Sequence, residues 1–103
     1  MTASRGEVWL VDLGYVGKVR PGLVLSIEPL ESDRALVTLI PHTTSPRGTR
    51  FEVDLRISFL KPGAFDAQNP ITIPQPKLMR KLGVLTADEL AQLENAVRTW
   101  LGL

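Results

Sequence analysis

Short apolar runs fill the first three quarters of the chain and predict β-strands. Glu7–Leu13 is rich in β-forming residues, whereas Gly22–Ile27 and Ala35–Ile40 are almost continuously apolar and are typical of strands buried on both faces. Phe51–Leu55 alternates cleanly and predicts a half-exposed strand. We expect the third of these strands to stop at Pro41, because proline cannot donate into a central ladder.

Weaker signals follow in the middle of the chain. A glycine-containing loop over 14–20 and a polar connection over Glu28–Arg34 separate the first strands. After a turn at 61–63, residues 64–70 predict a short polar strand or extended piece, and Ile71–Ile73 a last short strand. Lys77–Leu82 has the composition of a turn or two of helix ending at Gly83.

The C-terminal segment carries the clearest local signal. Thr86 is an N-cap candidate with Glu89 three residues later, and Leu85 and Leu90 occupy the positions of a hydrophobic staple. Gly102 is a typical stop residue. Between them, the apolar residues recur at helical spacing and predict a packing helix with one apolar stripe, made of Leu90, Leu93, Val97, Trp100 and Leu101.

Strands first and a helix last predict a mainly β (α+β) fold. We expect a small, strongly curved antiparallel sheet, or a partly open barrel, capped by the C-terminal helix. The 103 residues suit a single domain over 1–103. No apolar run has the length of a membrane span and no signal peptide is evident at the N-terminus, so we expect a cytoplasmic protein.

Composition narrows the chemistry. The apolar fraction is 44%, the charged fraction is 22% and the net charge is +1, so the sequence predicts a folded protein without a global field that attracts nucleic acid. The chain has no cysteine, and His42 is its single histidine. These counts exclude thiol nucleophiles, disulfides and zinc sites built from cysteine or several histidines, and we expect no metal and no cofactor.

Local charge is more informative than net charge. Lys18 and Arg20 occur in the 14–20 loop without an acid, and Arg47 and Arg50 occur in the 41–50 loop without an acid. Charged loops are usually only solvated, but two such loops on a nearly neutral chain also suit a local anion site. Pro21 biases Arg20 towards an extended backbone, so this arginine should be held in place.

Cleavage of RNA is within reach of the groups that remain, because the substrate carries its own nucleophile, the 2′-hydroxyl. The protein then needs only to orient the phosphate, move protons and stabilise charge. Arg20 can supply the charge, and the hydroxyls of Thr43, Thr44 and Ser45 can donate hydrogen bonds. Both segments adjoin strands that we expect to be neighbours, so they can lie on the same rim of the sheet.

Four segments of the sequence resemble the MazF/PemK family of toxin endoribonucleases, in the same order along the chain. They are RGEVWLVDL, GKVRPGLVLS, ALVTLIPHTTS and ITIPQPKLMRKLGVLTADELAQL. The resemblance runs from Arg5 to the C-terminus. It implies a homodimeric SH3-like barrel that cuts single-stranded RNA at short sequences without a metal.

The resemblance also implies roles for individual residues. Arg20 matches the family's catalytic arginine, and Thr43 matches a threonine that stabilises the transition state. The match at Arg5 and Gly6 implies only a structural role. Further RNA contacts are expected in the neighbouring loops, from Tyr15 as a stacking platform and from Lys18, His42, Thr44, Ser45 and Arg47.

Three questions stay open in the sequence. Either Gln68 or Asn69 occupies the position of a family glutamine, depending on a one-residue shift. His42 is a base contact, a proton carrier or simply a hydrogen-bonded histidine. Tyr15 either stacks on a base or packs.

The partners expected from the resemblance are single-stranded RNA, a second copy of the chain and a cognate antitoxin. An acidic, disordered antitoxin tail is predicted to lie over the groove that Lys18, Arg20, Arg47 and Arg50 border. Two other functions are compatible with the same fold: a non-catalytic toxin that poisons a protein target such as gyrase, and an SH3-like binding module.

Overall fold

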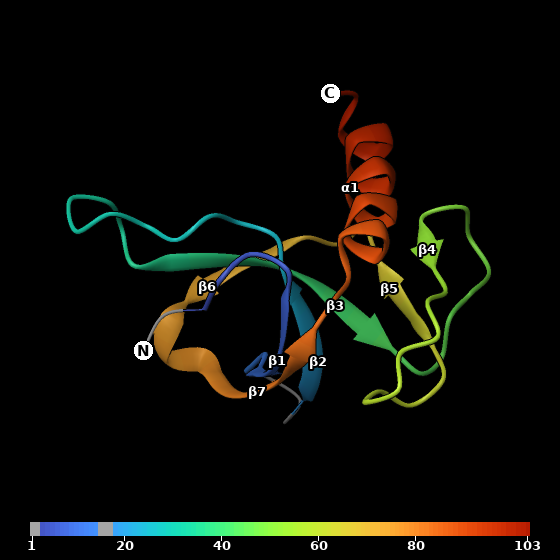
Figure 1. The fold of residues 1–103 in the computed structure, drawn as a ribbon, viewed down its shortest axis with the longest axis horizontal. Helices are drawn as coiled ribbons and strands as arrows, with labels where there is room; N and C mark the ends of the chain where they lie inside the picture. Colours follow the sequence, from blue (N-terminus) through green and yellow to red (C-terminus); the bar gives the residue numbers. More distant parts are fainter. Residues whose placement is uncertain (1–2, 15–17) are drawn as a thin grey trace.

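The computed structural model describes residues 3–14 and 18–103, in which seven strands precede a single α-helix (Figure 1). The elements are β1 (Glu7–Asp12), β2 (Val19–Val24), β3 (Leu36–Thr43), β4 (Glu52–Val53), β5 (Ala64–Asp66), β6 (Ile71–Pro74), the 3-10 helix η2 (Gln75–Lys77), β7 (Leu78–Val84) and α1 (Ala87–Leu101).

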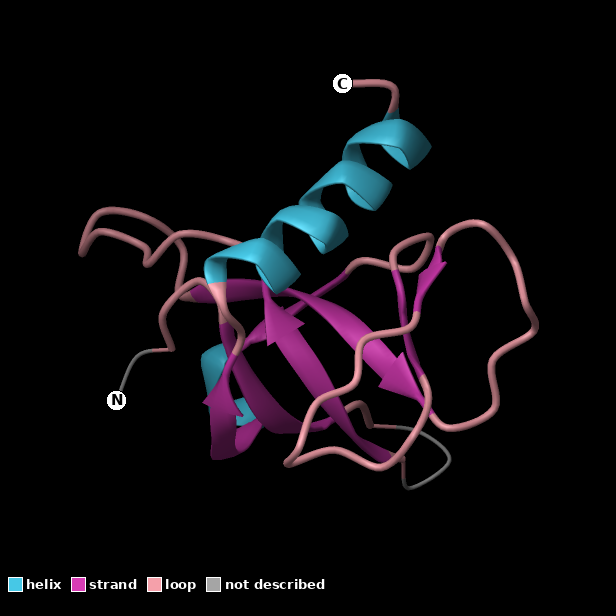
Figure 2. Cartoon of the chain, turned by 45° about the vertical axis from the view of Figure 1, so that its right-hand side comes forward, coloured by secondary structure: helices cyan, strands magenta, loops and turns pink. Residues whose placement is uncertain are grey.

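All the strand pairs are antiparallel, and the sheet is open. The order of the strands is β4-β5-β3-β2-β1-β7, and β6 also pairs with β3. The helix α1 crosses over the sheet on one side (Figure 2). The predicted mainly β fold, a partly open barrel with a C-terminal packing helix, is therefore confirmed.

Strand alternation divides the core between the two faces of the sheet. Val8 and Leu23 belong to the cluster under α1, where Leu93 is fully buried. Their chain neighbours Trp9 and Val24 belong to a second cluster on the other face. Because successive side chains of a strand point to opposite faces, strands buried on both sides need the nearly continuous apolar runs seen in the sequence.

The start and the stop of α1 are as the sequence predicts. The Thr86 hydroxyl accepts from the Glu89 backbone N–H and the Glu89 carboxylate accepts from the Thr86 backbone N–H, which completes a capping box. Gly102 ends the helix with φ 71°. The apolar stripe was only partly right, because Trp100 and Leu101 are 44% and 54% exposed at the end of the helix that projects past the sheet.

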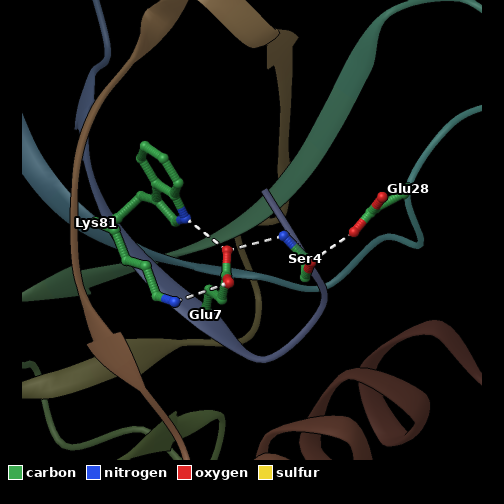
Figure 3. Close-up of polar contacts among 5 residues, drawn as sticks. Ser4, Glu7, Glu28 and Lys81 are labelled. Atoms are coloured by element: carbon green, nitrogen blue, oxygen red, sulfur yellow. Dashed lines mark hydrogen bonds and ion pairs between the residues drawn. The ribbon is translucent and has the colours of Figure 1, made fainter. Parts of the chain in front are cut away.

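A polar cluster fixes the first strand to its surroundings (Figure 3). The Glu7 carboxylate accepts from the Ser4 backbone N–H at 2.8 Å and pairs with Lys81 of β7 at 3.0 Å. Burial raises the pKa of Glu7, but these bonds and one from Trp9 outweigh burial and lower it overall. Arg5 bonds the Leu25 carbonyl and pairs with Glu94 of α1, which agrees with a structural role for this residue.

Strand β2 begins earlier than the sequence predicts. It starts at Val19 and ends at Val24, so Arg20 lies within the strand, paired with Val11, and not at the end of a loop. Ile27 lies beyond the strand and is 77% exposed, whereas we predicted a buried strand up to this residue. Pairing with β1 extends β2 at the expense of the loop, and an apolar run alone cannot reveal where a partner strand ends.

Strand β3 does not stop at Pro41 but continues to Thr43. On the side of β3 that faces away from β2, β6 pairs with Leu36–Leu39, and β5 pairs only with His42 and Thr43. Pro41 lies in the gap between these two partners, where a residue without an N–H need not interrupt a ladder.

The turn or two of helix predicted over Lys77–Leu82 does not form. After η2, this segment forms most of β7, which pairs with β1 through two register shifts. Tertiary pairing thus overrides the local preference of a lysine- and leucine-rich segment.

Within the described residues, no helix is long and apolar enough to cross a membrane.

Candidate active site

A groove of about 600 Å³ opens where β2, β3 and the loops after β3 and β5 meet. We call it the first groove. Polar and charged side chains from four separate segments line it, together with the apolar residues Leu13, Pro41 and Ile71. The polar lining consists of Arg20, His42, Thr43, Ser45, Arg47, Thr49, Glu52, Asp66, Gln68 and Asn69.

Arg20 is positioned by the sheet. It is half-buried in β2 and pairs with Val11 of β1, while the following Pro21 restricts its backbone to extended conformations. The ion pairs among the described residues join Arg5 to Glu94 and Glu7 to Lys81, so Arg20 forms no ion pair with a described carboxylate. A guanidinium held in this way presents its planar array of donors to an anion in the groove.

Thr43, the last residue of β3, lines the same groove. Its hydroxyl oxygen accepts a hydrogen bond from the Ser45 backbone N–H at 3.1 Å. This bond orients the side chain and leaves the hydroxyl proton available as a donor. The structure therefore brings Arg20 and Thr43 together, as the sequence predicts for the candidate catalytic pair.

A carboxylate that the sequence reasoning missed organises the loop after β3. Glu52 accepts from the backbone N–H of Arg47 at 2.8 Å and of Thr49 at 2.7 Å. These backbone bonds, the first from Arg47, lower the pKa of Glu52. The ionised carboxylate therefore holds Arg47 at the rim of the first groove. The feature of the sequence that could have indicated this role is a glutamate five residues after an arginine, in a loop with proline and glycine.

His42 forms part of the wall between the first groove and a second hollow. Its side chain is 3% exposed and its ring meets Phe65 edge-on, with the ring centroids 5.0 Å apart. Burial lowers the pKa of His42, while Asp54 raises it by a smaller amount. Among the described residues, no side-chain nitrogen or oxygen is both fully buried and without a hydrogen-bond partner.

The second hollow, of about 450 Å³, lies on the other side of Arg20 and His42, and we call it the basic pocket. Two of the predicted RNA-binding residues, Lys18 and Thr44, line this pocket and not the first groove. Sequence reasoning did not identify Phe59, Lys61 and Arg80, which also line it. Phe59 and Lys61 come from a loop outside the four family segments, and Arg80 lies in the fourth segment, where the resemblance assigned it no role.

Other predicted site residues lie as follows. Ser45 and Arg47 line the first groove, and so do both Gln68 and Asn69, so the groove does not discriminate between the two amides. Arg50 lines neither hollow, and its guanidinium carbon lies 4.5 Å from the centroid of the Phe51 ring. The prediction for Tyr15 falls outside the described residues.

The turn after β5 is also held by a carboxylate. Asp66 accepts from the Gln68 backbone N–H at 3.1 Å, and its carbonyl accepts from the Asn69 N–H at 3.2 Å. The carboxylates of Asp66 and Glu52 therefore accept hydrogen bonds from backbone N–H groups. No group of three or more His, Cys, Asp and Glu side chains suitable for a metal ion occurs in the described part of the chain.

Comparisons with known proteins agree with this architecture. The profile of the family described as "PemK-like, MazF-like toxin of type II toxin-antitoxin system" matches residues 4–101. Endoribonuclease MazF3 of Mycobacterium tuberculosis is 32% identical over 89 residues, which cover 84% of this chain and 86% of that protein.

Solved structures show the same fold. An endoribonuclease in complex with its cognate antitoxin, from a mycobacterial species, superposes with a TM-score of 0.84 at 29% identity, covering 99% of this chain and 97% of the other. MazF from Deinococcus radiodurans gives a TM-score of 0.82 at 27% identity and covers 100% and 99% of the two chains. The chain therefore belongs to the PemK-like, MazF-like toxins of type II toxin–antitoxin systems.

Proposed function

We propose that this chain is the endoribonuclease toxin of a type II toxin–antitoxin pair and that it cuts single-stranded RNA, mRNA included, in the first groove. Its family and the endoribonuclease name of its curated relative support the activity. The observation that carries the site is the meeting of an un-neutralised Arg20 and an oriented Thr43 hydroxyl in one groove.

The reaction proposed for this groove needs no metal. The 2′-oxygen attacks the adjacent phosphorus, a new 2′-O–P bond forms, the P–O5′ bond breaks, and the 2′-hydroxyl proton leaves while the 5′-oxygen gains one. Arg20 binds the non-bridging oxygens with two parallel N–H donors, and Thr43 donates a further hydrogen bond. Arg47 and the amides of Gln68 and Asn69 contact the neighbouring nucleotides and contribute to sequence specificity.

The partners proposed for the chain follow from its relatives. Structures similar to this one include complexes of a toxin with its cognate antitoxin, and we propose that an antitoxin with an acidic, disordered tail covers the first groove here as well. Arg50 lies away from both hollows, so such a tail would meet Arg20 and Arg47 in the first groove and Lys18 in the adjoining basic pocket. We place the activity in the cytoplasm, where mRNA is translated.

Cleavage of a mixed-sequence RNA in EDTA tests this function. The parent protein should cut at defined short sequences, and Arg20→Ala should slow single-turnover cleavage by about two to three orders of magnitude, the loss typical of one transition-state donor. Thr43→Ala should slow cleavage less than Arg20→Ala does, because a neutral donor forms a weaker hydrogen bond than a charged one. Arg34→Ala is the matched control, since Arg34 is an exposed arginine that lines neither hollow.

An Arg20→Ala protein that stays folded and cuts at the parent rate would place the chemistry elsewhere. A parent protein that never cuts RNA but arrests gyrase would instead support the non-catalytic toxin.

A further inference from the structure

The basic pocket carries more uncompensated charge than the first groove. Lys18, Arg20, Lys61 and Arg80 line it, and no aspartate or glutamate does. The first groove, in contrast, combines two arginines with Glu52 and Asp66. None of the four cations belongs to an ion pair of the described residues. Like charges brought this close repel one another, so the pocket is suited to a polyanion.

Close packing builds this pocket from distant segments. Lys61 comes from the segment 54–63, and Arg80 comes from β7. A methyl group added at Gly83 of β7 would lie 2.4 Å from the Phe59 ring, so this ring rests directly on the β7 backbone. The contact holds the 54–63 segment against the sheet and keeps Lys61 and Arg80 on the same hollow. Phe59 is still 36% exposed and offers an aromatic wall beside the cations.

Arg20 connects the two hollows, because it lines both. We propose that the basic pocket binds the RNA backbone phosphate next to the one that is cut, with Lys61 and Arg80 as its ligands. This inference rests on the proposed function and adds two residues to it. A strand whose scissile phosphate lies on Arg20 continues past the groove, and the adjoining hollow offers cations without competing carboxylates.

An acidic peptide is the other polyanion that this charge could attract. The geometry favours a nucleic acid, because Arg20 is shared with the candidate site of phosphate cleavage and an exposed aromatic ring stands beside the cations. A peptide also gains little from an aromatic wall unless it carries apolar side chains.

The test uses Lys61→Gln and Arg80→Gln with a matched control for each. Arg56→Gln removes a cation from the same 54–63 segment, and Lys77→Gln removes one from η2, just before β7, but neither residue lines the basic pocket. Binding is measured with a non-cleavable 2′-O-methyl RNA of about ten nucleotides at several salt concentrations. Single-turnover cleavage of the matching RNA is measured at saturating protein.

Lys61→Gln and Arg80→Gln should each weaken binding about fivefold at 0.1 M salt. The double variant should reduce the slope of log K against log salt by about 0.7, the value for one phosphate contact on a single strand, and each single variant should reduce it by part of this amount. The cleavage rate at saturation should stay within about twofold of the parent, because neither residue touches the reacting atoms. Arg56→Gln and Lys77→Gln should behave like the parent.

The inference is overturned if the two pocket variants bind RNA like their controls, whatever the cleavage activity. It is also overturned if they lose only the binding of a poly-glutamate peptide. A parent protein that binds the RNA analogue but cuts no RNA would contradict the proposed function alone, since the binding data still judge the pocket.

Discussion

Arg20 and His42 share a wall between two hollows but differ in how the fold treats their charge. Arg20 stays half-exposed and meets no described carboxylate, so its charge faces the grooves. His42 is buried beside Phe65, and burial disfavours its protonated form. The neutral imidazole therefore adds no positive charge to the two hollows that both residues line.

The lowered pKa of His42 predicts a pH dependence of stability. Well above pH 6.5, the ordinary histidine value, both folded and unfolded chains hold the neutral ring. As the pH falls below 6.5, the unfolded chain binds the proton first, so the free energy of unfolding falls until the pH passes the folded pKa. His42→Gln should flatten this part of the profile, measured by urea unfolding between pH 7.5 and 5.

Two other groups with lowered pKa values, Glu7 and Glu52, have an ordinary value of 4.5, so their effect on stability develops mainly below the window between pH 6.5 and 5. A parent profile that is flat between pH 6.5 and 5, or a slope that persists in His42→Gln, would contradict the assignment to His42.

At the scale of elements, the site depends on a close approach between β3 and β5. The two strands pair through His42 with Phe65 and Thr43 with Ala64. Gly63 precedes β5, and a methyl group there would lie 2.1 Å from the Thr43 carbonyl oxygen and 2.8 Å from the His42 ring. No side chain fits, so glycine is required by space and not by its backbone freedom.

Gly63→Ala should therefore destabilise the protein by about 1–3 kcal/mol, the usual cost of overpacking, and should slow RNA cleavage by displacing Thr43. Thermal melts and single-turnover cleavage measure the two effects. Gly22→Ala is the control, because its methyl group would meet Leu39 at an ordinary 3.4 Å. Equal melting temperatures for the two variants would show that β3 and β5 can separate at little cost.

At the scale of the whole molecule, the sheet ends in strands that lack a partner on one side. β4 and β7 are its two outer strands, and Met79 and Val84 of β7 are 52% and 55% exposed. Together with Trp100 and Leu101 at the end of α1, they leave apolar surface uncovered. Edges and surfaces of this kind are commonly buried between copies of a chain.

We predict a homodimer on these grounds. Light scattering at micromolar concentration should give about twice the 11.4 kDa of one chain, and Trp100→Glu should shift the mass towards the monomer if the end of α1 takes part. Ile27→Glu, at a more exposed apolar position on the loop after β2, is the control. A monomeric parent that still cuts RNA would refute the dimer.

The sequence by itself determined the features that depend on near neighbours in the chain. The capping box at Thr86 and the stop at Gly102 are local, because helix ends follow from residues a few positions apart. The strand predicted over Phe51–Leu55 was only partly right, because β4 is limited to Glu52–Val53. The order of four motifs also identified the family and, through it, predicted Arg20 and Thr43 as the candidate catalytic pair. The absence of cysteine excluded thiol nucleophiles, disulfides and thiolate metal sites.

Only the tertiary structure decided what depends on distant partners. Most of Lys77–Leu82 lies in strand β7, β3 continues past Pro41, and Arg20 lies inside β2. Each outcome depends on pairing with another strand, which supplies hydrogen bonds that no local sequence pattern records. The tertiary structure also gathered Lys61 and Arg80 with Arg20 at one hollow and assigned Glu52 to the loop that carries Arg47. Residues far apart in sequence meet there only because the sheet curves and its loops pack against it.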